Sequence, residues 1–513
     1  MSASNSAAEP VKGACVAAVD LGTQTTRAAL MARDGSVIDD AATPVPLLMS
    51  APGVAEQRPA DWWDATVANL SALMDRNPDA PIASVAVGAQ MHGVVPVGTD
   101  GESLCEQVAI WSDKRAADVA ARLNADPGID ALTLIARNRP EPAWSGLKIA
   151  WFREHLPEVY AAADTFLVAK DFVNLKLTGR ACTDPTEASG SWLMDGGSDA
   201  WSERLLEAVG VDGNKLPPIV GSCAPIGGVS RSAAELTGLP AGTPVVAGAG
   251  DMLCHLLGTG LTEPNRFSEI SGTASIIASY AEEAKLESTV MNLRAAGEGW
   301  VRFGISDAGG IALRWFAEEL CEGIAAEGAT AEMSRYDVLC DLASGVSSGS
   351  FGLTFLPFLL GERSLGNAAA RATLIGLTPR HGRAEIFRAI LEGVCFDLKR
   401  YLEAMGPDPG AAELRVSGGG ATSPLWNQIR ADVYGLPVQR ITSAEGGLLG
   451  TAMLAQVGAG WYPDVASAAE ALVVPADVSQ PDPGSRGSYA QAYRRFRSAH
   501  AAADALWESW EQP

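Results

Sequence analysis

The 513-residue sequence predicts an α/β protein with more than one domain. Short apolar runs typical of strands alternate with longer amphipathic stretches typical of helices along the whole chain. The length favours two or three domains, each with its own core. In addition, two strand–turn–strand segments with a Gly-Thr turn recur 250 positions apart, at 22–23 and 272–273.

The expected elements begin with a β-hairpin, because the apolar run Cys15–Val19, a glycine turn and the run Arg27–Ala32 follow one another. Pro59 suits the first turn of a helix, and the apolar residues after it recur at helical spacing. Those residues are Trp62, Trp63, Val67, Leu70, Leu73 and Met74. Further strands are expected at Ser84–Gly88 and Val245–Gly248, and further helices at Gly310–Cys321, Ala384–Met405, Pro424–Tyr434, Gly447–Val457 and Tyr489–Trp510.

The segments Val16–Ala29 and Phe267–Ser279 share the order strand, Gly-Thr turn, strand. A repeat at this distance suggests two related domains that face one cleft. Two unrelated hairpins are the alternative, because Gly-Thr is a common dipeptide. We expect a loose tail at 1–12, domains at 13–258 and 259–482, and a C-terminal helix within 483–513 that packs back on them.

The net charge is −23, a sign that repels phosphate backbones, so we expect no nucleic-acid partner. The eight cysteines include no CxxC pair, which argues against a zinc site or a disulfide framework. A reducing, cytoplasmic location is therefore expected. We expect no membrane association, since no run is long and apolar enough and the N-terminus has no apolar signal core.

Two Gly-Thr turns are candidate anion sites. Tight glycine turns direct backbone N–H groups toward an anion, and threonine hydroxyls add donors. Asp20, at the end of the first strand, can hold Mg²⁺ through water. The first candidate set is Gly22, Thr23, Gln24, Thr25 and Arg27, and the second is Gly272 and Thr273. The alternative for each segment is a plain surface turn.

A third glycine-rich turn, Ser417–Ala421, leads into a helical pattern. Its glycines, Gly419 and Gly420 among them, would let a flat ligand or a phosphate approach the backbone. A turn that binds nothing is the alternative. The fingerprints GxGxxG and GxxxxGK[ST] are absent here, so Rossmann and P-loop sites are not indicated.

Two further segments carry side chains suited to a polyol. Asp251 leaves a strand through glycines and could accept a proton from a hydroxyl, or simply cap the following helix. Gln90, Met91 and His92 follow a strand and could hydrogen-bond a sugar, although a lone histidine is often structural. Asp113 could meet sugar hydroxyls or cap a helix.

In this order, the segments resemble the FGGY carbohydrate kinases, which have the actin-like (ribonuclease H-like) ATPase fold with two domains flanking a catalytic cleft. The resemblance runs from about residue 14 to 500. AQMHG at 89–93 resembles the sugar loop of the family's xylulose kinases. The other segments are DLGTQTTR, WSDKR, AKDF, AGAGD, SGTAS, LPFLLGER, LEGV and SGGGATSPLW.

The resemblance implies ATP-dependent phosphorylation of a sugar, with D-xylulose to D-xylulose 5-phosphate as the expected reaction. It implies Asp251 as general base, with Mg²⁺ near Asp20. Met91 and His92, with Gln90 and Asp113 beside them, would bind the sugar. The Gly-Thr turns would hold the ATP phosphates, Gly309 would join the nucleotide site, and Gly419 and Gly420 would lie beside adenine and ribose. It also implies a homodimer.

Three features depart from the family pattern. Met252 stands where similar proteins carry Asn or Gln, Gln24 replaces a small hydroxyl residue, and 139–148 follows the pattern only loosely. L-ribulose, sedoheptulose, a deoxyketose or glycerol therefore stay open as acceptors. A non-catalytic nucleotide-binding protein of the same fold is a further alternative. Glu362 and Arg363 are expected to form a structural ion pair.

Overall fold

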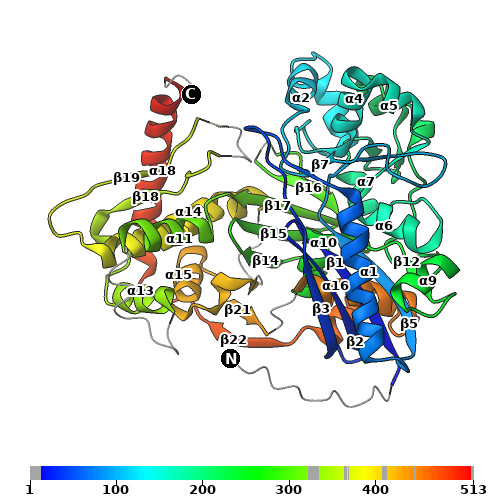
Figure 1. Ribbon diagram of the computed structural model, residues 1–513. Helices are drawn as coiled ribbons and strands as arrows, with labels where there is room; N and C mark the ends of the chain where they lie inside the picture. Colours follow the sequence, from blue (N-terminus) through cyan, green and yellow to red (C-terminus); the bar gives the residue numbers. More distant parts are fainter. Residues whose placement is uncertain are drawn as a thin grey trace.

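The computed structural model describes residues 13–287, 289–321, 334–362, 367, 369–406, 413–442 and 446–509. Two mixed β-sheets lie side by side, each with helices packed against it (Figure 1). The expected tail at 1–12 and Arg363 lie outside the described residues. Within the described part, no helix is both long and apolar enough to cross a membrane.

The first sheet is ordered β11-β12-β5-β1-β2-β3, with β13 also paired to β5, and the second is ordered β16-β17-β15-β14-β20-β21-β22. The first comprises β1 (Cys15–Leu21), β2 (Thr25–Ala32), β3 (Val37–Pro44), β5 (Ile82–Ala89), β11 (Pro225–Gly228), β12 (Pro244–Val246) and β13 (Ala249–Gly250). The second comprises β14 (Arg266–Ser271), β15 (Ser275–Ala281), β16 (Met291–Arg294), β17 (Trp300–Ser306), β20 (Glu413–Ser417), β21 (Val438–Ile441) and β22 (Pro475–Ser479).

The two sheets repeat one topology. In the first, β1, β2 and β3 form an antiparallel meander, while β5 and then β12 add in parallel on the other side of β1. In the second, β14, β15 and β17 form the meander, while β20 and β21 add in parallel. The two Gly-Thr turns occupy equivalent places, which favours duplication over two unrelated hairpins.

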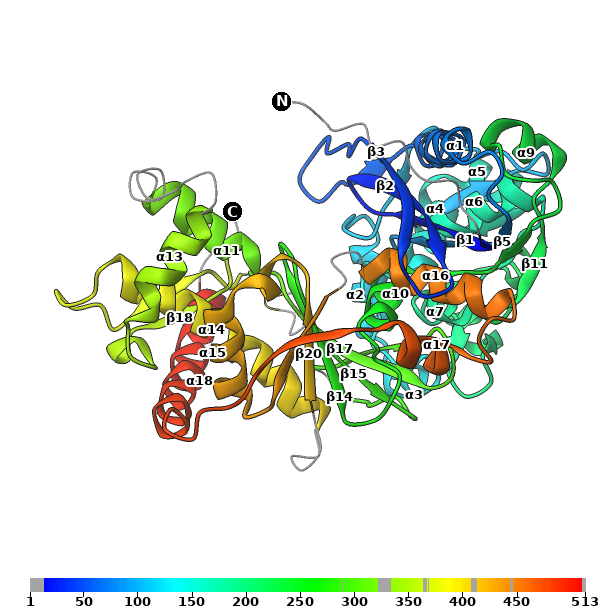
Figure 2. The same cartoon turned by 90° about the horizontal axis from the view of Figure 1, so that it is seen from below.

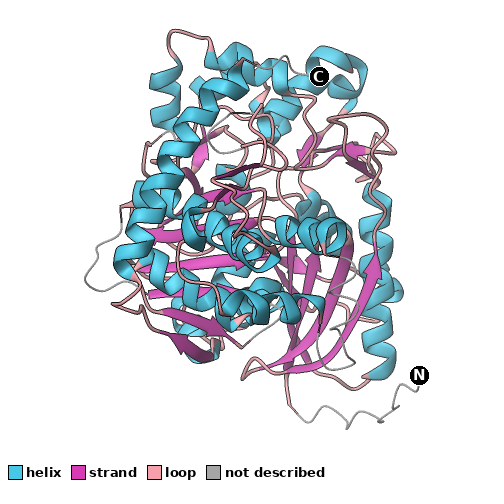
Figure 3. Cartoon of the chain, turned by 90° about the vertical axis from the view of Figure 1, so that its left-hand side faces the viewer, coloured by secondary structure: helices cyan, strands magenta, loops and turns pink. Residues whose placement is uncertain are grey.

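Helices cover both sheets, as Figure 3 shows by colour. The first half contains α1 (Pro59–Arg76), α2 (Ala117–Asn124), α3 (Ile129–Ala136), α4 (Ser145–His155), α5 (Pro157–Ala162), α6 (Ala169–Thr178), α7 (Pro185–Ser189), α8 (Glu203–Val209), α9 (Arg231–Thr237) and α10 (Asp251–Gly258). The second contains α11 (Gly310–Trp315), α13 (Arg335–Ser344), α14 (Arg383–Met405), α15 (Pro424–Tyr434), α16 (Gly446–Gly458), α17 (Val465–Leu472) and α18 (Arg486–Glu508).

Short elements complete the chain. The paired strands are β4 (Glu56–Gln57) with β7 (Val108–Ala109), β6 (Val95–Val97) with β8 (Thr165–Leu167), β9 (Met194–Asp195) with β10 (Ala200–Trp201), and β18 (Thr354–Leu356) with β19 (Thr373–Ile375). The single turns are η1 (Gly213–Lys215), the π-helical η2 (Phe316–Leu320), η3 (Ser350–Gly352) and η4 (Gly419–Thr422).

Three elements differ from the sequence-based expectation. The helix expected at Gly310–Cys321 changes to a π-helical turn after Trp315. The strand expected at Val245–Gly248 ends at Val246, and Gly248 beyond it has a φ of +76° and a missing Cβ that leaves room for the Val87 carbonyl. On α1, Trp62, Leu70 and Leu73 are buried, whereas Trp63 and Val67 stay partly exposed at the edge of the apolar face.

Helix α16 belongs to the second half of the sequence but packs against the first sheet. It contacts β1, β5 and α10, and its apolar residues share a core cluster with Val16 and Ala18 (Figure 2). By contrast, α18 packs against α14, α15 and β18 of the second domain. The chain therefore crosses between the domains more than once, and the segment 446–473 belongs structurally with the first sheet.

Candidate active site

A cavity of about 810 Å³ lies between the two domains. Its lining includes six of the candidate site residues: Asp20, Gly22, Thr23, Met91, His92 and Asp251. They come from the ends of β1, β5 and the β13–α10 junction, which are neighbouring strand ends of the first sheet. Ligands of open α/β sheets bind at such carboxyl ends of strands.

Asp251 is the first residue of α10 and faces this cavity. Its carboxylate also accepts a hydrogen bond from the Met252 amide at 2.7 Å, so the residue serves the helix terminus as well as the cavity. Burial, followed by the nearby charge of Asp20, raises the pKa of Asp251 to about 7. The carboxyl group can therefore gain or lose a proton near neutral pH.

A buried polar chain holds the backbone that carries Asp251. The Gly250 amide donates to the Thr186 hydroxyl at 3.0 Å, and that hydroxyl donates to Asp184 at 3.0 Å. Asp184 in turn pairs with Lys170 at 3.0 Å, and both side chains are fully buried. Each group has a partner, so this chain fixes the strand end without an unpaired charge.

The first Gly-Thr turn closes through a hydrogen bond from the Gly22 amide to the Thr25 carbonyl at 3.1 Å. Thr23 lines the cavity, and its hydroxyl accepts from the Trp111 indole N–H at 3.0 Å. Gln24 and Arg27 are exposed and, like Thr25, lie outside the cavity lining. Only the glycine and the first threonine of this candidate set reach the cavity.

Asp20 faces the same cavity at the N-terminal end of α16. A Cβ on Gly447 would come within 2.9 Å of an Asp20 carboxylate oxygen, so the glycine permits the close approach of that helix. Gly447 itself lines the cavity. The N-terminal end of α16 thus lies beside the Asp20 carboxylate.

His92 is held in an unusual backbone conformation with φ of 65°. The Lys148 ammonium donates to the His92 carbonyl at 3.0 Å and to the Ala143 carbonyl at 2.7 Å. Burial, then the charge of Lys148, lowers the pKa of His92 to about 3, so the ring is neutral. Its Nδ1 is buried against the Gly190 backbone, since a Cβ on that glycine would come within 2.9 Å of it.

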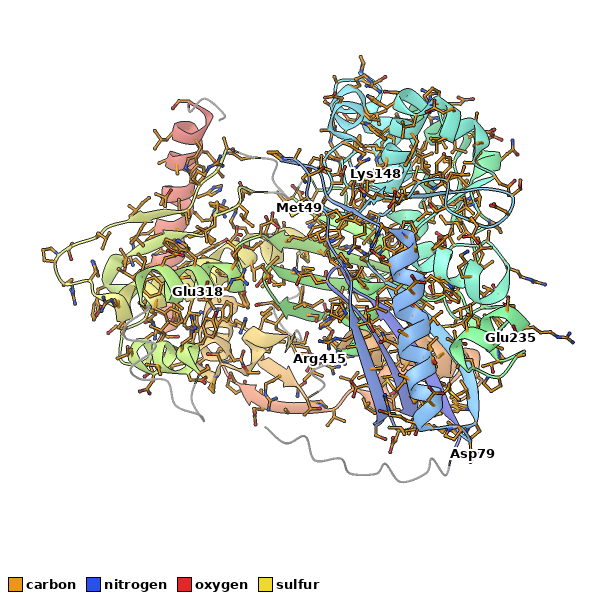
Figure 4. All side chains as sticks on the ribbon, in the orientation of Figure 1. Met49, Asp79, Lys148, Glu235, Glu318 and Arg415 are labelled. Atoms are coloured by element: carbon orange, nitrogen blue, oxygen red, sulfur yellow. The ribbon has the colours of Figure 1, made fainter. Side chains whose placement is uncertain are left out.

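Lys148 was not anticipated from the sequence. It lies on α4, among the helices of the first domain (Figure 4). Burial lowers the pKa of its ammonium group to about 7. A Cβ on Gly190 would come within 2.6 Å of the His92 ring, so a glycine is needed there too. The imidazole is therefore packed from several sides into one orientation.

The geometry does not support Asp113 or Gln90 as sugar ligands. The Asp113 carboxylate accepts from Arg115 at 2.7 Å and from the Ala55 amide at 2.9 Å, and it is fully buried. Gln90 is also buried and donates to Gln57. Neither residue lines the cavity. Both side chains instead form hydrogen bonds within the fold around the first Gly-Thr turn.

The second Gly-Thr turn carries an exposed Gly272 and Thr273 at the edge of the second domain. Gly309 packs directly on this turn, since a Cβ there would come within 2.4 Å of the Ser275 hydroxyl. The Gly310 amide donates to the Gly272 carbonyl at 2.9 Å. Gly309 therefore shapes the turn, and of this region only Ala274 and neighbouring strand residues line the cavity.

The Gly-rich turn lies next to the second Gly-Thr turn. Gly418 has a φ of +82°, and a Cβ on it would come within 2.7 Å of the Ser271 carbonyl. Gly420 packs against Trp426, whereas Gly419 has open space beside it. A flat group can approach the backbone at Gly419. Neither Gly419 nor Gly420 lines the cavity, so this turn is a separate part of the site.

A buried ion pair joins these two turns. Arg430 and Glu269 are fully buried and bonded at 2.8 Å. Arg430 also donates to the Ser271 hydroxyl at 2.6 Å and to the Gly420 carbonyl at 3.3 Å. Tyr434 donates to the second Glu269 oxygen at 3.1 Å. The ion pair ties α15 to both turns of the second domain.

His255 is a cavity residue that the sequence reasoning missed. It lies one turn after Asp251 on α10, and its Nε2 is 2.9 Å from the Ser417 hydroxyl, across the domain boundary. The spacing of four residues from Asp251 was a usable signal, because residues four apart share a helix face. Glu362 pairs with Arg400 at 2.8 Å, and its expected partner Arg363 lies outside the described residues.

Comparison with known proteins follows the same division. Residues 15–258 match the N-terminal domain, and 270–459 the C-terminal domain, of the FGGY family of carbohydrate kinases. A xylulose kinase of Bacillus subtilis (strain 168) is 29% identical over 465 residues, which are 89% of this chain and 91% of that protein. A gluconokinase of Bacillus licheniformis is 26% identical over 441 residues, 85% of this chain and 86% of that one. The crystal structure of xylulose kinase from Rhodospirillum rubrum gives a TM-score of 0.87 at 29% identity, covering 96% of this chain and all of that one.

Two domains with one repeated sheet topology, facing a cleft with carboxylates in it, define an ATPase of the actin-like fold. The match of both family domains covers most of the chain. The chain belongs to the FGGY family of carbohydrate kinases and is an ATP-dependent sugar kinase.

Proposed function

We propose that the chain phosphorylates D-xylulose at its 5-hydroxyl, with ATP as donor. The observation that carries the proposal is Asp251, whose carboxyl group faces the cavity with a pKa raised to about 7. Met91 and the neutral His92 line the same cavity. Similarity to xylulose kinases over almost the whole chain supports a ketopentose as the acceptor.

Asp251 would accept the proton of the acceptor hydroxyl as the hydroxyl oxygen attacks the γ-phosphorus of ATP. The bond from that phosphorus to the bridging oxygen breaks, and ADP leaves with the bonding electron pair. A carboxylate with a pKa near the working pH combines proton affinity with a useful charged fraction. The polar chain behind Gly250 fixes the position of this base.

The two Gly-Thr turns would bind the phosphates. Gly22 and Thr23 line the cavity from the first domain, and Ala274, next to the second Gly-Thr turn, lines it from the second domain. The open space at Gly419 would take the flat adenine ring beside that second turn. Transfer then depends on positioning, which the rigid sheet ends and the Arg430 network supply.

Asp20 and Asp251 suit a magnesium ion, because Mg²⁺ prefers carboxylate and water oxygens. The two carboxylates share one cavity, and the charge of Asp20 raises the pKa of Asp251, so a cation there would relieve their repulsion. We infer that Asp20 would hold Mg²⁺ through water. The ion would offset the negative charge of the ATP phosphates.

We also infer a cytoplasmic location. All eight cysteines are free thiols, as is usual in reducing compartments. The homodimer implied by the family resemblance stays a prediction, which sedimentation velocity would test.

The test of the acceptor is ADP release with Mg-ATP against a panel of D-xylulose, L-ribulose, sedoheptulose, gluconate and glycerol. We expect the highest kcat/KM for D-xylulose, with phosphate on the 5-oxygen by ³¹P NMR. A tenfold preference for gluconate or another panel member would overturn the ketopentose assignment and keep the kinase.

A further inference from the structure

The cavity that holds Asp251 continues along an apolar wall that the proposed reaction does not use. The wall residues belong to four neighbouring strands of the second sheet, β14, β15, β17 and β16, together with α3 and the start of α10. They are Leu134, Met252, Ile270, Ile276, Met291, Leu293, Phe303 and Ile305.

The strand register makes this wall continuous. Ile270 pairs with Ile276 across β14 and β15, and Ile276 pairs with Ile305 across β15 and β17. Met291 pairs with Phe303 one step further along the same sheet face. Directly paired residues point to one face of a sheet, so these side chains form one apolar surface.

Several of these side chains are open to the cavity. Ile270, Ile276, Met291 and Ile305 are only partly buried, and Leu134 is 54% exposed. Apolar side chains this close together are normally covered in a folded protein, and an uncovered group of them indicates a binding surface.

The two domains are fastened together beside this wall. Asn138 of the first domain donates to the Asn292 carbonyl at 2.7 Å and accepts from the Asn292 amide at 2.8 Å. The Asn292 side chain also donates to the Arg137 carbonyl at 2.9 Å. Strand β16 is therefore fixed to the first domain, so the space beside it is a built compartment and not a gap left by parted domains.

We propose that this compartment binds an apolar substituent on the acceptor, at the end remote from the hydroxyl that receives the phosphate. The inference rests on the proposed function, since it places the reacting hydroxyl at Asp251. The acceptor class is then a polyol or ketose that carries an alkyl or aryl group. The acceptor's own hydroxyls face His92 and Asp251, and its substituent lies against Ile276, Met291 and Leu134.

The size of the cavity agrees with this class. At ~30 Å³ per water, 810 Å³ corresponds to about 27 waters, a space that a ten-atom pentose and the phosphates proposed at Gly22 and Thr23 share with the apolar compartment. The Gly-rich turn proposed for adenine lies outside this space. The compartment opens to solvent near the exposed Asp130–Arg139 ion pair, so a longer substituent has an exit.

The test compares D-xylulose with its 1-O-methyl, 1-O-propyl and 1-O-hexyl ethers under Mg-ATP. We expect kcat/KM to rise about fourfold for each methylene buried, the equivalent of ~0.8 kcal/mol, and so about fifteenfold from methyl to propyl. A ratio that stays within twofold, or falls with length, while D-xylulose is phosphorylated would overturn the compartment alone.

Variants locate the effect. In Leu134→Gln and Met291→Gln, the propyl-to-methyl ratio of kcat/KM should drop below about fivefold. Leu236→Gln changes an equally exposed leucine on α9 and should leave the ratio at the wild-type value. An unchanged ratio in both wall variants would place the substituent elsewhere and contradict the proposal.

Failure of the proposed function can be distinguished from failure of the apolar compartment. If neither D-xylulose nor its ethers are phosphorylated, that function is wrong, and calorimetric titration with the ethers decides the compartment. Tighter binding of the propyl than of the methyl ether, with a negative heat-capacity change, would support it. Equal affinities would overturn it.

Discussion

The Asp251 carboxyl group lies at the start of α10 and faces the cavity. Burial raises its pKa first, and the Asp20 charge adds to that effect. The helix start and the Met252 amide act in the opposite direction, because both favour the carboxylate. The balance leaves a pKa of about 7, which suits a base that works at neutral pH.

This balance predicts the pH dependence of the reaction. The base must be deprotonated to accept the hydroxyl proton, so kcat/KM for the sugar should fall about tenfold per pH unit below a pKa near 7. Initial rates from pH 5 to 9 would measure it. Asp20→Asn removes the neighbouring charge and should lower the pKa of Asp251 in the absence of Mg²⁺. A midpoint near 4 in the wild type would contradict the account.

Residue positions could be predicted only where the backbone decides them. Asp251, His92 and Gly22 follow strand ends, and all three line the cavity, while their roles stay predictions. Asp113 and Gln90 follow strand ends as well, but their side chains turn to Arg115 and Gln57. Which way a polar side chain turns depends on partners far along the chain, and a single sequence does not show those partners.

At the scale of elements, the Arg430–Glu269 pair connects α15 to the two turns proposed for the nucleotide. The pair is fully buried. The Arg430 guanidinium donates hydrogen bonds to Glu269, Ser271, Gly420 and Asn427. A buried pair of this kind adds little net stability over apolar residues of similar size. We therefore expect the Arg430–Glu269 pair to matter more for the positions of the two turns than for folding stability.

A pair of substitutions separates these effects. Arg430→Met alone leaves the Glu269 carboxylate buried without its charged partner, which should cost about 3–5 kcal/mol of folding stability. The double variant Arg430→Met with Glu269→Leu should recover most of that stability. Because Ser271 and Gly420 lose their anchor in both, the KM for ATP should stay raised about tenfold. Urea unfolding and initial rates would measure the two effects; an unaltered KM for ATP in the stable double variant would refute the positioning role.

The ends of a helix could be predicted where a single sequence signal, such as a proline or a glycine, sets each of them. The helix Pro424–Tyr434 begins with a proline and ends before Gly435, and the structure has those bounds. The helix from Gly310 instead changes form after Trp315, for which local propensity gives no signal. The strand before Gly248 ends at Val246, and a Cβ on Gly248 would clash with the carbonyl of Val87, a residue 161 positions earlier in the chain.

At the scale of the whole molecule, the repeated topology was visible in the sequence as two Gly-Thr turns. The crossing of α16 back to the first sheet was not visible in the sequence, because its apolar pattern fits either domain.

The cleft has two kinds of contact between the domains. Asn138 and Asn292 fasten one side, while His255 on the Asp251 helix meets Ser417 beside the Gly-rich turn.

The His255–Ser417 contact predicts energetic coupling between sugar and ATP. It joins the acceptor side of the cleft to the nucleotide side, so each ligand should bind more tightly in the presence of the other. In Ser417→Ala, we expect that coupling to shrink about threefold while each ligand alone binds as in the wild type. Titration of a non-hydrolysable ATP analogue with and without D-xylulose would measure it. Ser344→Ala, an exposed serine on α13, is the control. Equal coupling in both variants would contradict this prediction.

The most direct test of the central claim is turnover by Asp251→Asn, with ATP binding measured on the same preparation. The account predicts that ADP release on D-xylulose falls by at least about a thousandfold, since the asparagine cannot accept the hydroxyl proton. ATP affinity should change by less than about threefold. Turnover within tenfold of the wild type, with ATP bound, would show that Asp251 is not the base.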